Sequence, residues 1–88
     1  MTFQGAVISE QNITFAIVIV KQYVMNSQTK SKETIQSFQP IFPEFPIILM
    51  AQNSSGRPAY YGRKDIVRFL SDVPIDAIQW KEYNINNW

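Results

Sequence analysis

The sequence contains neither cysteine nor histidine. The missing cysteine excludes disulfides, thiolate zinc sites and cysteine nucleophiles. The missing histidine removes the usual general base near neutral pH and the commonest metal ligand. The acidic residues are scattered along the chain, and none of them forms a short-spaced group with metal-ligand character. These absences argue against an enzyme and predict a chain that needs no cofactor and no metal.

The chain also lacks an excess of charge of either sign. Eight lysines and arginines stand against seven aspartates and glutamates, which gives a net charge of +1 and little field to attract nucleic acid or an anionic membrane. The longest apolar run, Phe15 to Val20, is too short to span a bilayer, and the N-terminus has no signal-peptide pattern. Because small secreted domains usually carry disulfides, we predict a cytoplasmic protein with no membrane contact, for which nucleic acid is a disfavoured partner.

The composition itself is that of a small globular chain. Of the 88 residues, 45% are hydrophobic and 14% are aromatic, which is enough for one core but leaves no room for two. We predict a single domain over residues 1–88. Its tail, residues 86–88, should fray unless Trp88 docks on the rest of the chain or on another chain.

Two apolar segments predict the centre of a sheet. Residues 13–24, ITFAIVIVKQYV, are rich in β-branched side chains, and both faces are apolar from Phe15 to Val20. This pattern is typical of a central strand that is covered on both sides. Residues 46–52, PIILMAQ, read as a second buried strand. We predict that the two strands lie side by side and parallel, joined by a right-handed crossover.

The other predicted elements surround this pair. They are a strand over 3–9, a helix over 30–39 that stops before Pro40, a strand over 58–62, a helix over 63–72 that stops before Pro74, and an edge strand over 77–85. The order is therefore β-β-α-β-β-α-β, an α+β (α/β-like) fold with a single mixed sheet of four to five strands and two helices. The helices should cover both faces of the sheet, unless residues 40–45 or a second subunit close one of them.

One stretch gathers cations and tyrosines at a strand-to-helix turn. It is SGRPAYYGRKD, residues 55–65. The start of the helix would attract anions, Gly62 would let a ligand approach the backbone, and a tyrosine ring could stack on a ligand. The candidate binding residues are Arg57, Tyr60, Tyr61, Gly62, Arg63 and Lys64. The same residues also suit a purely structural turn, in which the tyrosines face opposite ways and Asp65 pairs with Lys64 or Arg68.

We call this strand-to-helix turn, with its candidate binding residues, the corner. Two functions of different classes fit it. The first is a small non-enzymatic module that binds a protein partner, or binds a second copy of itself through the last strand as a homodimer. The second is a binder of a small anionic ligand or nucleotide at the N-terminus of the second helix, with or without an enzymatic role. Single-stranded nucleic acid is a weaker third ligand, because the chain supplies no continuous basic stripe.

Longer stretches carry two resemblances. Residues 45–70, FPIILMAQNSSGRPAYYGRKDIVRFL, resemble the second half of a thioredoxin-like domain without its redox cysteines, and this likeness implies a cis Phe45–Pro46 bond. The chain departs from that family before Pro46, where it has one helix in place of helix, strand and helix. The segments FAIVIVK, FPIILMAQ and YYGRKDIVRFLS resemble a group of small uncharacterised cyanobacterial proteins. That likeness implies a shared fold and brings no activity with it.

Overall fold

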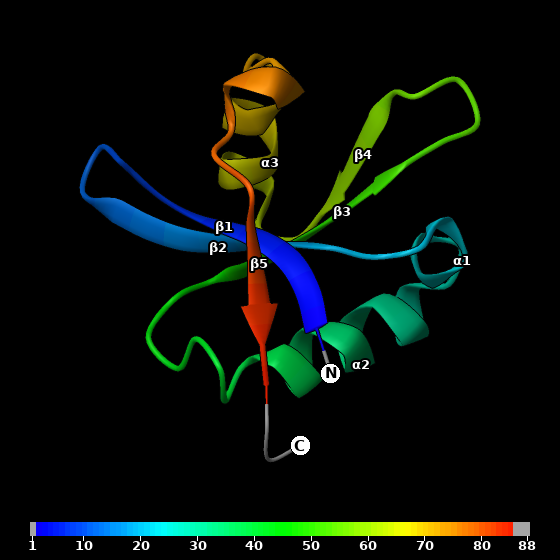
Figure 1. Cartoon of the computed structure of the whole chain (residues 1–88), viewed down its shortest axis with the longest axis horizontal. Helices are drawn as coiled ribbons and strands as arrows, with labels where there is room; N and C mark the ends of the chain where they lie inside the picture. The colour runs from blue at the N-terminus through cyan, green and yellow to red at the C-terminus, as the bar shows by residue number, and fades with distance from the viewer. Residues whose placement is uncertain (1, 86–88) are drawn as a thin grey trace.

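A computed structural model describes residues 2–85, which form one mixed sheet with helices on both sides (Figure 1). The strand order across the sheet is β4-β3-β2-β1-β5. In chain order, the elements are β1 (Thr2–Glu10), β2 (Ile13–Ile19), α1 (Gln22–Met25), α2 (Gln28–Phe38), β3 (Ile47–Gln52), β4 (Pro58–Tyr61), α3 (Lys64–Leu70), the 3₁₀ turn η1 (Ile75–Ala77) and β5 (Lys81–Asn84). The predicted α+β class is confirmed. The predicted fraying of 86–88 and docking of Trp88 concern residues outside the described range.

The parallel pair predicted at the centre of the sheet is β2 and β3. Ile17 lies opposite Ile48 in a parallel register, and the other three strand pairs are antiparallel. The Ala16 N–H donates to the Pro46 carbonyl at 2.9 Å at one end of this ladder, and the Val20 N–H donates to the Met50 carbonyl at the other, at 2.8 Å. The prediction that these segments run side by side in one direction is confirmed.

Both faces of the central strand are covered, because α2 and α3 lie on opposite sides of the sheet (Figure 1). Side chains alternate along β2. Phe15 and Ile17 pack with the buried residues of α3, on what we call the α3 face. Ala16 and Val18 pack with Phe38 of α2, on the α2 face. The two helices therefore cover both faces, and residues 40–45 add to the cover of the α2 face through Phe42.

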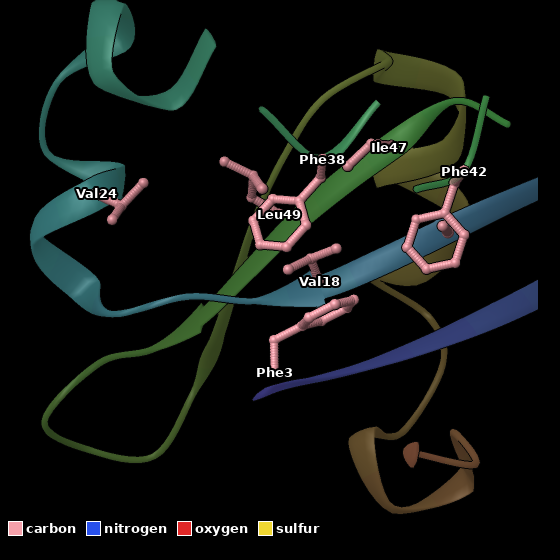
Figure 2. Packing of buried hydrophobic residues seen from close by; sticks show 8 residues of the cluster. Phe3, Val18, Val24, Phe38, Phe42, Ile47 and Leu49 are labelled. Atoms are coloured by element: carbon pink, nitrogen blue, oxygen red, sulfur yellow. The ribbon is translucent and has the colours of Figure 1, made fainter. Parts of the chain in front are cut away.

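The core of the α2 face is built around Phe3 of β1. Its ring meets the Phe38 ring edge-on, with centroids 4.9 Å apart, and stacks on Tyr83 of β5 at 5.0 Å. The Phe42 ring, from the connection between α2 and β3, lies 6.3 Å away. Figure 2 shows these phenylalanines grouped with Val18 and Leu49 over the sheet. The prolines around Phe42 thus hold an aromatic side chain over the same face that α2 covers.

The strand predicted over 13–24 is wrong beyond Ile19. Residues Gln22–Met25 form the short helix α1, because the ladder with β3 ends at Val20. Val24 then turns into the α2 face, and its carbonyl accepts a hydrogen bond of 2.9 Å from the fully buried Ser31 hydroxyl. This bond from α2 satisfies a backbone group that would otherwise be buried without a partner.

The ends of other elements also differ from the predictions. The last strand begins at Lys81, because 77–80 bond locally to η1: the Ala77 N–H donates to Pro74, and the Trp80 indole N–H donates to Ile75. The helix α2 begins at Gln28, because the Ser27 side chain caps it. The prediction of a cis Phe45–Pro46 bond is wrong, and this bond is trans.

Candidate functional site

The predicted corner lies where the edge strand β4 leads into α3. No strand within residues 2–85 pairs with the outer side of β4. The Tyr60 side chain packs on the α3 face, and the Tyr61 side chain packs on the α2 face. The expectation that the two tyrosines face opposite ways is confirmed.

The backbone of β4 leaves polar groups open along this outer side. In the β3–β4 hairpin, the Asn53 N–H donates to the Arg57 carbonyl at 3.0 Å. Hydrogen-bonded pairs alternate along an antiparallel ladder, so Ala59 and Tyr61 bond to β3 and Tyr60 does not. The peptide N–H and carbonyl of Tyr60 therefore point outward, where a further strand would lie.

A hollow of about 430 Å³ runs beside this edge, and we call it the β4 hollow. It is lined by Tyr60, Tyr61, Gly62, Lys64, Val67 and Arg68. The hollow lies between the edge strand β4 and α3, because its lining combines two residues of β4 with three residues of α3. Four of the six predicted site residues line it, whereas Arg57 and Arg63 do not.

Two cations of the β4 hollow are unpaired. Lys64 and Arg68 stand four residues apart on α3 and so share one side of the helix. Neither forms an ion pair with another residue of the described range. The sequence analysis named Lys64 as a candidate and expected Asp65 to pair with Lys64 or Arg68, although the four-residue spacing could have placed the two cations together.

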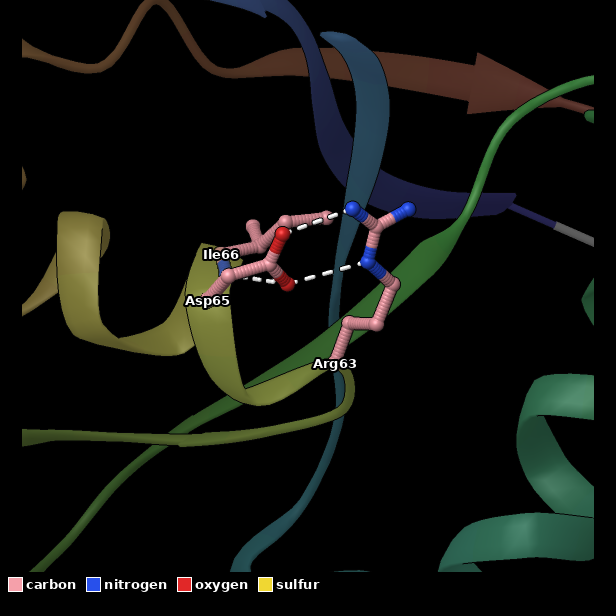
Figure 3. A network of polar contacts seen from close by, with 3 residues as sticks. All are labelled: Arg63, Asp65 and Ile66. Atoms are coloured by element: carbon pink, nitrogen blue, oxygen red, sulfur yellow. Dashed lines mark hydrogen bonds and ion pairs between the residues drawn. The ribbon is translucent and has the colours of Figure 1, made fainter.

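The carboxylate of Asp65 pairs with Arg63 instead. The Arg63 Nε donates to Oδ1 at 2.9 Å, and its Nη2 donates to Oδ2 at 2.6 Å (Figure 3). Oδ1 also accepts from the Ile66 N–H at 3.0 Å. The predicted pairing of Asp65 with Lys64 or Arg68 is wrong, because the Arg63 side chain lies forward along the start of the helix. This leaves Lys64 and Arg68 free for other partners.

The ion pair sets the ionisation of both partners. The hydrogen bonds from Arg63 are the main cause that holds the pKa of Asp65 below its usual value, and the same pair raises the pKa of Arg63. Both side chains are about half exposed, at 51% and 54%, so solvent screens the pair.

Replacing Arg63 by glutamine should raise the pKa of Asp65 toward its ordinary value of about 3.9. A carboxylate whose folded pKa lies below its unfolded pKa adds stability above the unfolded value, and this stability is lost as the pH falls through the folded pKa. The wild type should therefore lose its advantage over Arg63→Gln only below about pH 4. An NMR titration of the Asp65 carboxyl carbon in both chains measures the shift. An identical Asp65 pKa in the two proteins would contradict the pairing.

The turn at Gly62 packs directly on β3. Its φ is +154°, and a Cβ there would lie 2.5 Å from Ile48 Cδ1 and 3.1 Å from the Ile47 carbonyl oxygen. Ile48 is fully buried and has little room to move. Glycine is thus required here by the close approach of the turn to β3.

Tyr60 carries the one orphaned side-chain atom among the buried polar atoms of residues 2–85. Its hydroxyl is buried and finds no hydrogen-bond partner there. Burial also raises the pKa of Tyr60 above its ordinary value. A buried hydroxyl without a partner costs free energy, and a hydrogen-bond acceptor placed next to it would remove that cost.

The described part of the chain offers no metal centre and no membrane helix. Within residues 2–85, no three aspartate or glutamate side chains stand close enough together to hold a metal ion. Over the same range, each helix is too short or too polar to cross a bilayer.

Comparison with known proteins adds no relative: no protein-family model, no curated protein and no solved structure matches the chain. The resemblance to small cyanobacterial proteins and to half of a thioredoxin-like domain stays a prediction. A function for this chain therefore has to be argued from the geometry of the corner between β4 and α3.

Proposed function

We propose that the chain is a small protein-interaction module whose edge strand β4 takes up an extended, acidic segment of a partner protein. The observation that carries the proposal is the β4 hollow, which combines an unpaired strand edge with the free cations Lys64 and Arg68. An extended segment can add to such an edge as a further strand, with main-chain hydrogen bonds for affinity and side-chain contacts for specificity.

The backbone of the edge suits this mode of binding. Tyr60 presents both its N–H and its carbonyl to an incoming strand, as derived above. Pro58 lacks an N–H and limits pairing at the start of β4, and the chain turns into α3 after Tyr61. The docked part of the partner should therefore be short, about four residues, to match the length of β4.

The side chains around the edge select for negative charge. On an added strand, alternate residues would point to the α3 face, where Lys64 and Arg68 lie without carboxylate partners. Acidic residues at those positions would pair with the two cations. Charge complementarity of this kind raises the association rate and favours the right partner, and both effects weaken with salt.

The other edge of the sheet is less suited to a partner of one charge. Strand β5 begins with Lys81 and Glu82, which are both exposed and carry opposite charges. A second copy bound through β5 was the homodimer expected from the sequence. We favour β4 because the hollow lies along its edge. A small anion is the competing ligand for Lys64 and Arg68, and it is tested alongside the peptide.

The probe that tests the proposal is an eight-residue peptide of alternating valine and glutamate, titrated into the ¹⁵N-labelled protein. We expect slower amide exchange at Tyr60 and saturable shifts around the β4 hollow. The double variant Lys64→Glu/Arg68→Glu should bind roughly tenfold more weakly or worse, a loss of about 1.4 kcal/mol. Lys32→Glu, on the exposed side of α2, is the matched control and should bind as the wild type does.

Three outcomes would count against a docked acidic strand. The first is equal binding by the wild type and the double variant, and the second is an unchanged exchange rate at the Tyr60 amide. The third is a valine–lysine peptide that binds as tightly as the acidic one. Inorganic phosphate is titrated in the same way. If millimolar phosphate saturates the chemical shifts around the β4 hollow and the peptide at the same concentration does not, the small-anion function is favoured instead.

A further inference from the structure

The carboxyl ends of the two parallel strands lie at the same end of the sheet. After β2, the chain turns into the helices α1 and α2, which cover one face with Val24 and Phe38. After β3, the chain turns through residues 53–57 into β4, which runs back along β3, so that α3 begins at the opposite end, where Gly62 lies against Ile47 and Ile48. The carboxyl end of β3 is therefore not followed directly by a helix.

A hollow of about 550 Å³ lies at that place, and we call it the crevice. Residues 19–22 at the end of β2 form one wall, and Met50 and Gln52 at the end of β3 form another. Residues Ile75 and Trp80, from η1 and the turn after it, close a further side. This volume lies within the range of small-molecule sites, which is about 300–1,000 Å³.

The inner surface of the crevice is apolar. Met50 is buried, and Ile19, Ile75 and Trp80 are half-buried and pack on the core of the α3 face. The Trp80 indole N–H donates to the Ile75 carbonyl at 3.3 Å, so the ring is tied to η1. An indole held in this way is a platform on which a flat ring can stack, and Met50 adds a polarizable contact.

The rim of the crevice is rich in amides. Gln4 of β1, Gln22 of α1 and Gln52 of β3 are all exposed and line it. Of these three side chains, only Gln52 bonds to another described residue, at 3.4 Å to the Gly56 carbonyl. A carboxamide donates and accepts at once, so the rim suits a ligand whose edge carries both donors and acceptors.

The charges at the rim cancel. Lys21 and Asp76 both line the crevice and are exposed. Together they contribute no net charge, which distinguishes this site from the β4 hollow with its two free cations. A neutral ligand therefore fits the crevice better than an anionic one.

We propose that the crevice binds a nucleobase or nucleoside. A base is flat, is neutral near pH 7 and has an edge of alternating donors and acceptors. Its face would stack against the Trp80 ring and contact Met50, as bases stack on aromatic side chains elsewhere. Its edge would bond to the amides of Gln4 and Gln22, since glutamine can hold a base edge with two hydrogen bonds. None of these residues lines the β4 hollow, so this inference does not depend on the proposed function.

Fluorescence of Trp80 tests the proposal directly. The chain has two tryptophans, so a Trp88→Phe chain leaves Trp80 as the only one. Titration with adenosine, guanosine, cytidine and uridine should give saturable quenching for at least one nucleoside. In this background, Gln4→Ala and Gln22→Ala should each weaken binding about fivefold through one lost hydrogen bond. Gln36→Ala, an exposed amide on α2 outside the crevice, is the control and should leave binding unchanged.

The unaltered protein provides a second measurement that needs no variant. In the ¹⁵N-labelled chain, the bound nucleoside should shift the side-chain NH₂ signals of Gln4 and Gln22 and leave that of Gln36 in place. No saturable quenching by any of the four nucleosides would overturn the proposal, as would equal affinity in the Gln4→Ala, Gln22→Ala and Gln36→Ala chains. Tighter binding of zwitterionic phenylalanine than of every nucleoside would also overturn it, because Lys21 and Asp76 would then select the ligand.

Discussion

Replacing Gly5 by alanine is expected to destabilise the protein by about 3 kcal/mol, near the upper end for an added methyl group in a packed interior. Gly5 lies in β1, where it pairs with Val18 of β2 and Lys81 of β5. A Cβ at this position would lie only 2.5 Å from the Ile17 carbonyl oxygen, and that oxygen belongs to the backbone of the central strand. The clash can be relieved only if β1 moves away from β2.

The rings above Gly5 make such a movement unfavourable. Phe3 and Tyr83 stack on each other at 5.0 Å, and an edge carbon of each lies 3.5–3.6 Å from the position of the added methyl group. A shift of β1 would therefore disturb both the ladder and the aromatic core of the α2 face. A chain of this length has a total stability of roughly 4–13 kcal/mol, so a large share of it would be lost.

Urea unfolding followed by circular dichroism measures the effect, and Gly56→Ala is the matched control. Gly56 has a φ of +82°, but its missing Cβ would meet nothing within 4 Å. Its replacement should cost about 1 kcal/mol from the left-handed backbone alone. If Gly5→Ala and Gly56→Ala lower the free energy of unfolding equally, the close contact between β1 and β2 does not control stability.

The centre of the sheet could be predicted because its signal is local. An unbroken apolar run such as Phe15 to Val20 must be covered on both faces wherever it lies, and the structure covers it with α2 and α3. Parallel pairing with β3 followed from the single helical connection between the two strands. The fold class rested on these two inferences and needed no detail of side-chain packing.

The errors at the ends of elements come from single hydrogen bonds that composition does not reveal. Tyr23 and Val24 favour a strand by composition, yet they lie in α1, since a hydroxyl from α2 bonds to the Val24 carbonyl. Trp80 was expected to lie in the last strand, but its indole bonds back to Ile75 and keeps it in a turn. Neither bond is visible in a sequence pattern, although its two partners lie only seven residues apart in the first case and five in the second.

The candidate corner was identified from the composition of residues 55–65. The structure then gave several of these residues roles that differ from the predicted ones. The density of cations and tyrosines identified the stretch, and strand alternation placed Tyr60 and Tyr61 on opposite faces. The pairing of Arg63 with Asp65 was missed, because a side chain at the start of a helix can lie forward along it. The crevice was missed altogether, since its walls come from segments that only the fold brings together.

Replacing Phe15 by alanine is expected to lower the free energy of unfolding by about 3–5 kcal/mol, the range for a large side chain lost from a core. Phe15 is 1% exposed and lies on the α3 face of β2. Its ring meets Phe69 of α3 edge-on at 6.4 Å. A cavity here would remove the support of α3 on its inner side, and α3 also carries Lys64 and Arg68.

Amide exchange distinguishes this specific loss from general destabilisation. In Phe15→Ala, protection should fall first in α3, while α2 on the other face keeps more of its protection.

The control is Val7→Ala in the same hairpin, whose side chain is 43% exposed and whose truncation should cost less than about 1 kcal/mol. Equal losses in the two variants would contradict the burial of Phe15. Equal loss of protection in α2 and α3 would mean that the two faces unfold as one unit. If α3 loses protection first, acidic-peptide binding at the β4 hollow should weaken as well. The distance of Lys64 and Arg68 from β4 depends on the position of α3, and α3 packs against Phe15.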